Sequence, residues 1–203
     1  MNALRMPVSA LVGDGVMLRT FQDCDADMLC DLATDPYLSL IGSLPANADR
    51  TEALAFIARQ HERMPTGVGY SFCVTDPADQ AVGTAGLWLA DLSQGRATVG
   101  YSIAPRFRGR GFARSALRTL TEFAWTLPEL FRIEAYIEPW NAGSVRTAEA
   151  CGYVREGLLR SHQPIGDRRA DMLLYANLRP DLSLPQSSGH TTRTEALPPN
   201  TSG

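Results

Sequence analysis

Hydrophobic and polar residues alternate at the centre of the chain, and then their spacing changes. Val99, Tyr101 and Ile103 fall on one face at period two, which predicts a strand. From Ala113 onward, apolar residues recur every three or four positions, the spacing of an amphipathic helix with one buried face. A strand that leads through a short loop into a helix is therefore expected here.

The same patterns divide the rest of the chain into short elements. Strands are expected over residues 16–21, 70–74, 81–89, 98–103, 131–138, 153–159 and 171–178. Helices are expected between the first strand and residue 35, over residues 49–63, from residue 113, and over residues 142–151. Asp49 and Glu52 have the spacing of a capping box, and an irregular loop is expected over residues 36–48. The mixture of strands and helices indicates an α/β fold.

Two glycines lie in the loop between the central strand and its helix, and five arginines gather in the loop and the first turns of that helix. Gly109 and Gly111 permit a sharp turn and a close approach by a ligand, and the first amides of the following helix favour an anion. The arginines are Arg106, Arg108, Arg110, Arg114 and Arg118. This combination predicts a phosphate site. The alternative is a short loop with solvated arginines, because Gly-x-Gly alone is a weak motif.

Composition narrows the class of protein. The 203 residues, 44% hydrophobic and 20% charged, are expected to form one domain over residues 11–180, after an N-terminal extension of residues 1–10. The polar, proline-punctuated tail of residues 181–203 is expected to be disordered. No apolar run is long enough to span a bilayer, and no secretory leader is evident. We therefore expect a cytoplasmic protein with neither a membrane nor a nucleic acid as partner.

Several chemistries are excluded by residue type. All 19 residues in the lysine and arginine total are arginine, so a lysine Schiff base, a Walker A lysine and a lysine general base are ruled out. Cys24, Cys30, Cys73 and Cys151 form no CxxC pair, and no metal site is expected. No serine or cysteine lies in a nucleophile motif such as Gly-x-Ser-x-Gly, so no covalent intermediate is expected.

The glycine loop is the first of several motifs that match one family. Arg106-x-x-Gly109-x-Gly111, between a strand and a helix, resembles the acyl-CoA pyrophosphate loop of the GNAT superfamily of N-acetyltransferases. Further matches follow in order: RIEA at 132–135, NAGS at 141–144, CGY at 151–153, REG at 155–157 and DMLLY at 171–175. Their order and spacing are similar to those of the RimJ/RimL-like branch, which acetylates the N-termini of ribosomal proteins. The resemblance covers residues 10–180.

This resemblance implies a single-domain GNAT fold, with a central, mixed, mostly antiparallel twisted sheet of six to seven strands flanked by about four helices. It also implies acetyl-CoA as the donor. The backbone amides expected to hold the donor pyrophosphate belong to Arg108, Gly109, Arg110, Gly111, Phe112 and Ala113. The Ile103 backbone is expected to contact the pantetheine or the thioester. Ala150 stands where relatives commonly have lysine, so one phosphate or ribose contact is lost.

Two residues at the start of the last helix are expected to serve the chemistry. The resemblance implies that Asn141 bonds the pantetheine arm and that Ser144 is a candidate to protonate the departing thiolate. Taken alone, the two residues also fit an ordinary helix start, with Asn141 as the N-cap. The two roles are compatible, because the same helix start can be capped and face the donor.

The base that takes the amine proton is less well defined. Glu134, Tyr136 and Glu138 alternate onto one face of their strand, and a carboxylate there could take the proton directly or through water. Glu134 matches a residue common in the family and is the candidate catalytic base. A structural role for Glu134 is the alternative.

The acceptor is expected, by resemblance, to be the α-amine of a protein or peptide N-terminus. A small-molecule amine, such as an antibiotic or metabolite, is the alternative among enzymes, and a non-catalytic acyl-CoA-binding module is the alternative outside them. The acceptor pocket is expected to involve residues 35–45, the second helix and residues 87–92, with Trp88 either as a wall or as core. The protein is expected to be a monomer or a homodimer.

Overall fold

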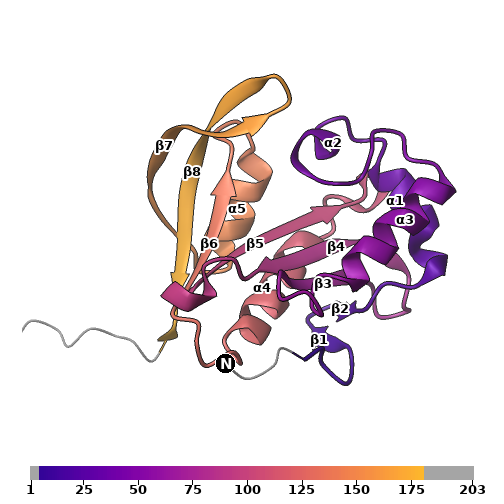
Figure 1. Ribbon diagram of the computed structural model, residues 1–203, viewed down its shortest axis with the longest axis horizontal. Helices are drawn as coiled ribbons and strands as arrows, with labels where there is room; N and C mark the ends of the chain where they lie inside the picture. The colour runs from indigo at the N-terminus through magenta and orange to yellow at the C-terminus, as the bar shows by residue number, and fades with distance from the viewer. Residues whose placement is uncertain (1–4, 181–203) are drawn as a thin grey trace, which may run out of the picture.

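One sheet organises the molecule. The computed structural model describes residues 5–180, whose strands lie in the order β1-β2-β3-β4-β5-β6-β8-β7 (Figure 1). The strands are β1 (Leu11–Gly13), β2 (Val16–Arg19), β3 (Gly69–Thr75), β4 (Ala81–Trp88), β5 (Arg96–Ile103), β6 (Arg132–Ile137), β7 (Val154–Ile165) and β8 (Arg168–Leu178). The helices are α1 (Ala26–Leu32), α2 (Leu38–Ile41), α3 (Arg50–His61), α4 (Phe112–Ala124) and α5 (Ala142–Ala150).

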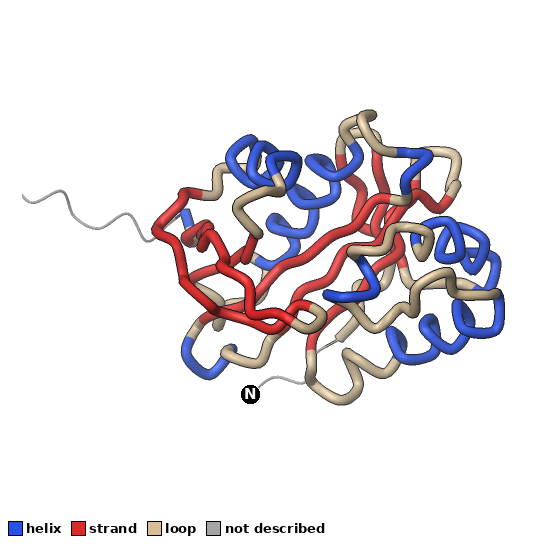
Figure 2. The backbone as a smooth tube through the Cα atoms, turned by 90° about the horizontal axis from the view of Figure 1, so that it is seen from above, coloured by secondary structure: helices blue, strands red, loops and turns tan. Residues whose placement is uncertain are grey.

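Helices cover both faces of this sheet. α1 packs against α3 and β4 on one face, and α4 packs against α5, β4 and β5 on the other (Figure 2). All neighbouring strands are antiparallel except β5 and β6, which are parallel. The β7–β8 hairpin lies at the end of the sheet remote from α1 and α3 (Figure 1). The expected mixed, mostly antiparallel α/β architecture is confirmed.

The central strand and helix form as their periodicity predicts. The strand expected over residues 98–103 is the greater part of β5, and the helix expected from residue 113 is α4. Leu117 and Leu120 on the inner face of α4 are fully buried. The regular spacing of these apolar residues is the reason that α4 could be located from sequence.

The shortest elements differ from expectation. β1 brings the strand count to eight in the described residues, above the six or seven expected, because three residues are too few to show a period. α2 forms a single turn inside the expected loop of residues 36–48. The last two strands extend beyond the expected ranges to meet at a turn around Gly166. Periodicity did not predict the extension, because residues 160–163 are all polar and show no apolar alternation.

The start of α3 follows the capping box that the sequence predicts. The Glu52 amide donates to the Asp49 carboxylate at 2.8 Å, and the Asp49 amide donates to the Glu52 carboxylate at 3.0 Å. Two amides that would otherwise lack partners are thereby bonded. α3 then carries the chain to Gln60 and, just beyond its end, Arg63, both of which line the cleft described below.

Within the described residues, no helix combines the length and the apolar character needed to cross a membrane. The expected tail of residues 181–203 lies outside the described part of the chain.

Candidate active site

β5 and β6 pair only at their beginnings and then separate. Residues 96–98 are in register with residues 132–134, while β5 continues to Ile103. The Ala104 amide donates to the Val82 carbonyl at 3.0 Å. Because backbone groups of successive strand residues point to opposite sides, the Ile103 amide faces away from β4, toward the side where β6 has diverged. The Ile103 amide is thus not used in pairing with β4.

A cleft of about 1100 Å³ opens where the two strands part. It reaches from the glycine loop and the start of α5 to α2 and the end of α3. Its lining includes most of the residues expected at the donor site: Ile103, Arg108, Gly109, Gly111, Phe112, Ala113, Asn141 and Ser144. The structure therefore brings together, in one cavity, segments expected to bind the donor and the acceptor.

The glycine loop has the backbone conformation that an anion site requires. Gly109 and Gly111 have φ values of 78° and 86°, in the left-handed region that favours glycine. A Cβ added to either would meet nothing within 4 Å, so the space beside both is open. Gly111 is the N-cap of α4, and no side chain caps the first amides of the helix. These amides, with the helix dipole, fit a phosphate group.

Two arginines of this loop are paired with acids of the N-terminal half. The Arg106 guanidinium lies 3.3 Å from the Asp31 carboxylate, and that of Arg108 lies 2.5 Å from Asp35. Arg108 also donates to the Ile103 carbonyl at 2.9 Å. Arg110 of the loop and two arginines of α4 are exposed and form no ion pair within residues 5–180: Arg114 and Arg118. Free positive charge therefore remains on the α4 side of the loop.

Asn141 and Ser144 lie together at the start of α5. The Ser144 amide donates to Asn141 Oδ1 at 3.1 Å, so the helix-cap role of Asn141 is confirmed. The Tyr101 hydroxyl, from β5, donates to the Ser144 carbonyl at 3.4 Å. Burial raises the pKa of Tyr101. The cap leaves the Asn141 amide nitrogen and the Ser144 hydroxyl available to a ligand in the cleft.

Glu134, the candidate base, does not line the cleft. Its buried carboxylate accepts one hydrogen bond from Arg132 Nε at 2.5 Å and another from the Tyr136 hydroxyl at 2.7 Å. Burial would raise the pKa of Glu134, but these two donors favour the charged form and hold the pKa below its ordinary value. Each carboxylate oxygen is bonded, so the contacts of Glu134 are those of the structural alternative.

Glu138, four residues further along, does line the cleft. Its side chain is 2% exposed, and Oε1 accepts a hydrogen bond from Arg168 Nη2 at 2.6 Å. Oε2 is buried and makes no hydrogen bond to any residue of the described chain. Burial would raise the pKa of Glu138, but Tyr37 and Arg168 beside it outweigh burial and hold the pKa below its ordinary value. An unpartnered buried carboxylate oxygen is costly.

The segment expected to shape the acceptor pocket borders the same cleft. Tyr37 and Ile41 line it from α2 and its N-cap. The Tyr37 ring packs edge to face against Trp140, with ring centroids 4.9 Å apart. The expectation for residues 87–92 holds in part, since Trp88 lines the cleft.

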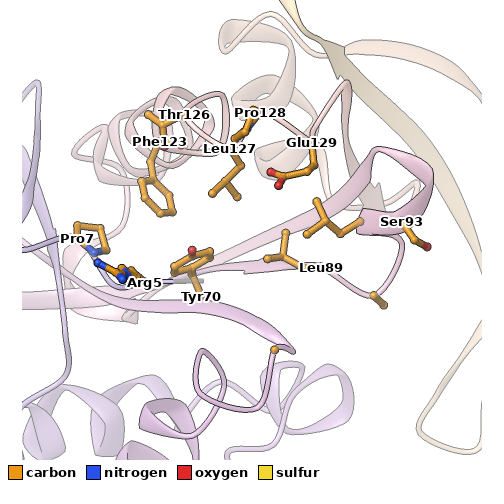
Figure 3. Close-up of a pocket in the computed structure, with 13 residues that line it drawn as sticks. Arg5, Pro7, Tyr70, Leu89, Ser93, Phe123, Thr126, Leu127, Pro128 and Glu129 are labelled. Atoms are coloured by element: carbon orange, nitrogen blue, oxygen red, sulfur yellow. Dashed lines mark hydrogen bonds between the residues drawn. The ribbon is translucent and has the colours of Figure 1, made fainter. Parts of the chain in front are cut away.

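Leu89, Ala90 and Leu92 line a second cavity instead, of about 810 Å³. Figure 3 shows Leu89 on the side opposite Leu127 in this cavity. The two cavities share no lining residue within the described chain. The expected acceptor pocket therefore ends at Trp88, because the chain leaves β4 there and turns toward α4.

Local sequence patterns did not point to Arg63, which lines the cleft, or to Arg168, which contacts Glu138. They also gave no reason to prefer Glu138 over Glu134. Alternation along β6 placed Glu138 on the same face as Glu134 without distinguishing them. Arg168 reaches Glu138 only because β8 pairs with β6, and Arg63 reaches the cleft only because α3 ends beside β4. Both positions depend on the order of the strands in the sheet, which no short sequence motif predicts.

The fold is an α/β fold whose cleft is bordered by a glycine loop that fits an anion. Residues 16–154 match the family described as acetyltransferase (GNAT) domain, and the chain belongs to this family. It is an N-acetyltransferase that uses acetyl-CoA as donor.

Similar proteins span more than one acceptor class. The uncharacterized N-acetyltransferase p20 of Bacillus licheniformis is 28% identical over 173 residues, which are 85% of this chain and 97% of that protein. RimL, a ribosomal L7/L12 alpha-N-protein acetyltransferase solved with coenzyme A, superposes with a TM-score of 0.71 at 16% identity over 84% of this chain and 98% of its own. Vibrio cholerae spermidine N-acetyltransferase, solved with CoA and spermine, superposes with a TM-score of 0.66 at 22% identity. The match covers 81% of this chain and 96% of that protein. The two structures share the fold with this chain.

Proposed function

We propose that this acetyltransferase transfers acetyl directly to the α-amine of a peptide or protein N-terminus. The observation that carries the proposal is the buried carboxylate of Glu138, a residue that lines the cleft together with Ser144 and has one oxygen without a hydrogen-bond partner in the described chain. In this proposal, Glu138 takes the role first considered for Glu134.

The donor end of the cleft is assigned to the glycine loop and its neighbours. Backbone amides of residues 108–113 would hold the pyrophosphate, the Ile103 amide would bond the pantetheine or thioester, and Asn141 would bond the pantetheine arm. Acetyl-CoA supplies the acetyl group as an activated thioester. The open space beside Gly109 and Gly111 and the uncapped start of α4 support this assignment.

Glu138 would accept the proton of the attacking amine. As the new nitrogen–carbon bond forms, the nitrogen becomes far more acidic, so a carboxylate of ordinary basicity can take its proton. The lowered pKa of Glu138 makes it too weak to deprotonate an ammonium group beforehand. The acceptor amine must therefore be substantially neutral by itself near neutral pH.

This requirement favours an α-amine over an aliphatic side-chain amine. An α-amine has a pKa of about 8, whereas a lysine-type amine has a pKa of about 10, so near pH 7.5 the neutral fraction of the first is larger by about two orders of magnitude. A thiolate leaves the thioester with the bonding electrons, and the Ser144 hydroxyl at the start of α5 is the proposed donor of its proton. The transfer then needs no covalent acetyl-enzyme.

An acceptor series measured by thiol release from acetyl-CoA tests the proposal. We expect kcat/KM to rise from alanine amide to a tetrapeptide amide with the same first residue, because added backbone contacts stabilise the transition state. A fall with each added residue, together with turnover of spermidine or a small amine, would replace the peptide acceptor by a small-molecule one. If the protein binds acetyl-CoA but releases no thiol with any amine, the alternative of a non-catalytic acyl-CoA-binding module would replace the proposed enzyme.

A further inference from the structure

An arginine lies on a flat aromatic surface inside the cleft. The Arg63 guanidinium carbon is 4.9 Å from the centre of the Trp88 ring, and both side chains line the cleft. The Trp88 ring covers Gly86 and Gly100, where an added Cβ would come within 3.0 Å of ring atoms. Glycine at these two positions allows the ring to lie against the strands, and the ring in turn supports the guanidinium through a cation–π contact.

Arg63 is the half-buried arginine of the cleft without an acidic partner in the described chain. It forms no ion pair within 4 Å and no side-chain hydrogen bond to residues 5–180. Arg108, by contrast, is paired with Asp35. The remaining cleft arginines are exposed, on α4 and α5: Arg114 and Arg146.

The charge of Arg63 is therefore uncompensated. Burial lowers the pKa of Arg63, and no nearby acid offsets the effect. A partly buried charge without a counter-charge reduces stability, which is typical of a group whose partner arrives with a ligand. A guanidinium presents parallel N–H donors that match a carboxylate.

We infer that Arg63, supported by Trp88, binds a carboxylate of the acceptor, so that the acceptor carries an anionic group in addition to its primary amine. The inference rests on the proposed function, because it assigns the amine to Glu138 and the carboxylate to Arg63 within one cleft. The carboxylate has two sources: an acidic side chain close to the N-terminus of a peptide, or the C-terminal carboxylate of a short peptide.

Three peptides and two variants test this inference. The peptides are Ala-Glu-Ala-Ala-amide, Ala-Gln-Ala-Ala-amide and Ala-Gln-Ala-Ala with a free C-terminal carboxylate. In the unmodified enzyme we expect at least one carboxylate peptide to exceed the neutral amide in kcat/KM by about 10- to 150-fold, the range of a charge-assisted hydrogen bond. Which of the two does so identifies the source. Equal values for all three peptides would overturn the inference without any variant.

Arg63→Gln should reduce this preference to about one while leaving the neutral peptide and the affinity for acetyl-CoA unchanged. Arg63→Lys keeps the charge and should retain part of the preference, which separates charge recognition from packing on Trp88. Arg50→Gln is the matched control, because Arg50 is exposed at the start of α3 and pairs with exposed Asp27. An equal loss on all peptides in Arg63→Gln would mean a structural role and would overturn the inference.

Calorimetric binding of the same peptides in the presence of CoA separates the two proposals. Turnover without a carboxylate preference would overturn the inference and leave the proposed function. Carboxylate-dependent binding that Arg63→Gln abolishes, without turnover of any peptide, would overturn the proposed function and support the carboxylate site. Binding that is independent of both the carboxylate and Arg63 would overturn the inference whatever the turnover.

Discussion

The two ends of the cleft are built in different ways. Apart from Asn141, the proposed donor end is one continuous segment, in which β5, the glycine loop and α4 follow each other over residues 96–124. The proposed acceptor end is lined by Tyr37, Arg63 and Glu138, which come from three separate parts of the chain, and Arg168 contacts Glu138 from a fourth. Local sequence therefore sufficed to propose the donor end, whereas the acceptor end depends on the order of strands in the sheet.

Replacing Gly111 should have the largest effect, and it tests the donor end. Gly111→Val should abolish measurable acetyl-CoA binding in titration calorimetry, because a branched side chain resists a φ of 86° and enters the open space at the start of α4. Loss of the donor site would remove all thiol release.

Gly15→Val is the matched control for this variant. Gly15 also has a positive φ, of 70°, and open space beside it, but it lies in the β1–β2 turn outside the cleft. It should lose stability for the same backbone reason and keep its affinity for acetyl-CoA. Unchanged affinity in a folded Gly111→Val protein would contradict the phosphate site.

Glu134 on β6 and Glu138, the residue that follows the strand, give the second prediction, which tests the acceptor end. Glu138→Gln should lower kcat by about 10²- to 10⁴-fold, the contribution typical of a general base, with little change in acetyl-CoA affinity. Glu134→Gln should instead lower the melting temperature, because it replaces the acceptor of two buried hydrogen bonds. Kinetics and thermal unfolding of both variants decide the assignment, and the reverse pattern would restore Glu134 as the base.

Glu134 and Glu138 also show which features of the site the sequence can and cannot predict. Alternation on β6 predicted that Glu134 and Glu138 share a face, and resemblance favoured Glu134. The choice between them depends on neighbours from other elements: Glu134 lies where β6 is paired with β5, while Glu138 is buried beyond the paired part and lines the cleft. Short sequence motifs do not predict the surroundings of either glutamate. The glycine loop differs because its proposed function depends mainly on its own backbone and the next helix.

Ser144 gives a smaller expected effect at the junction of the two ends. Ser144→Ala should lower kcat by about 10²-fold if its hydroxyl protonates the thiolate, and it should leave the α5 cap intact because Asn141 bonds the Ser144 backbone amide. Asn141→Ala is the complementary variant, expected to cost about 1 kcal/mol of unfolding free energy through loss of the cap. Full activity of Ser144→Ala would assign the proton to another donor.

Arg168 gives the smallest expected effect at neutral pH, and it tests the chemistry of the acceptor end through pH dependence. Its guanidinium is one of the groups that lower the pKa of Glu138, so Arg168→Gln should raise that pKa. A base with a lowered pKa is ionised at all pH values above it, so in the unmodified protein kcat/KM should fall only in acid well below neutrality. The variant should lose activity at a higher pH on the acid side, while the rise toward pH 8, set by the acceptor amine, stays in place.

Arg169→Gln is the control for the pH profile, because neighbouring Arg169 donates to the Ser161 and His162 carbonyls rather than to Glu138. Its acid limb should match that of the unmodified protein. An upward shift confined to Arg168→Gln would identify the group titrating on the acid side as the carboxylate that Arg168 contacts. Identical acid limbs in all three proteins would mean that Glu138 does not take the amine proton, and the acceptor end would then bind the amine without acting as its base.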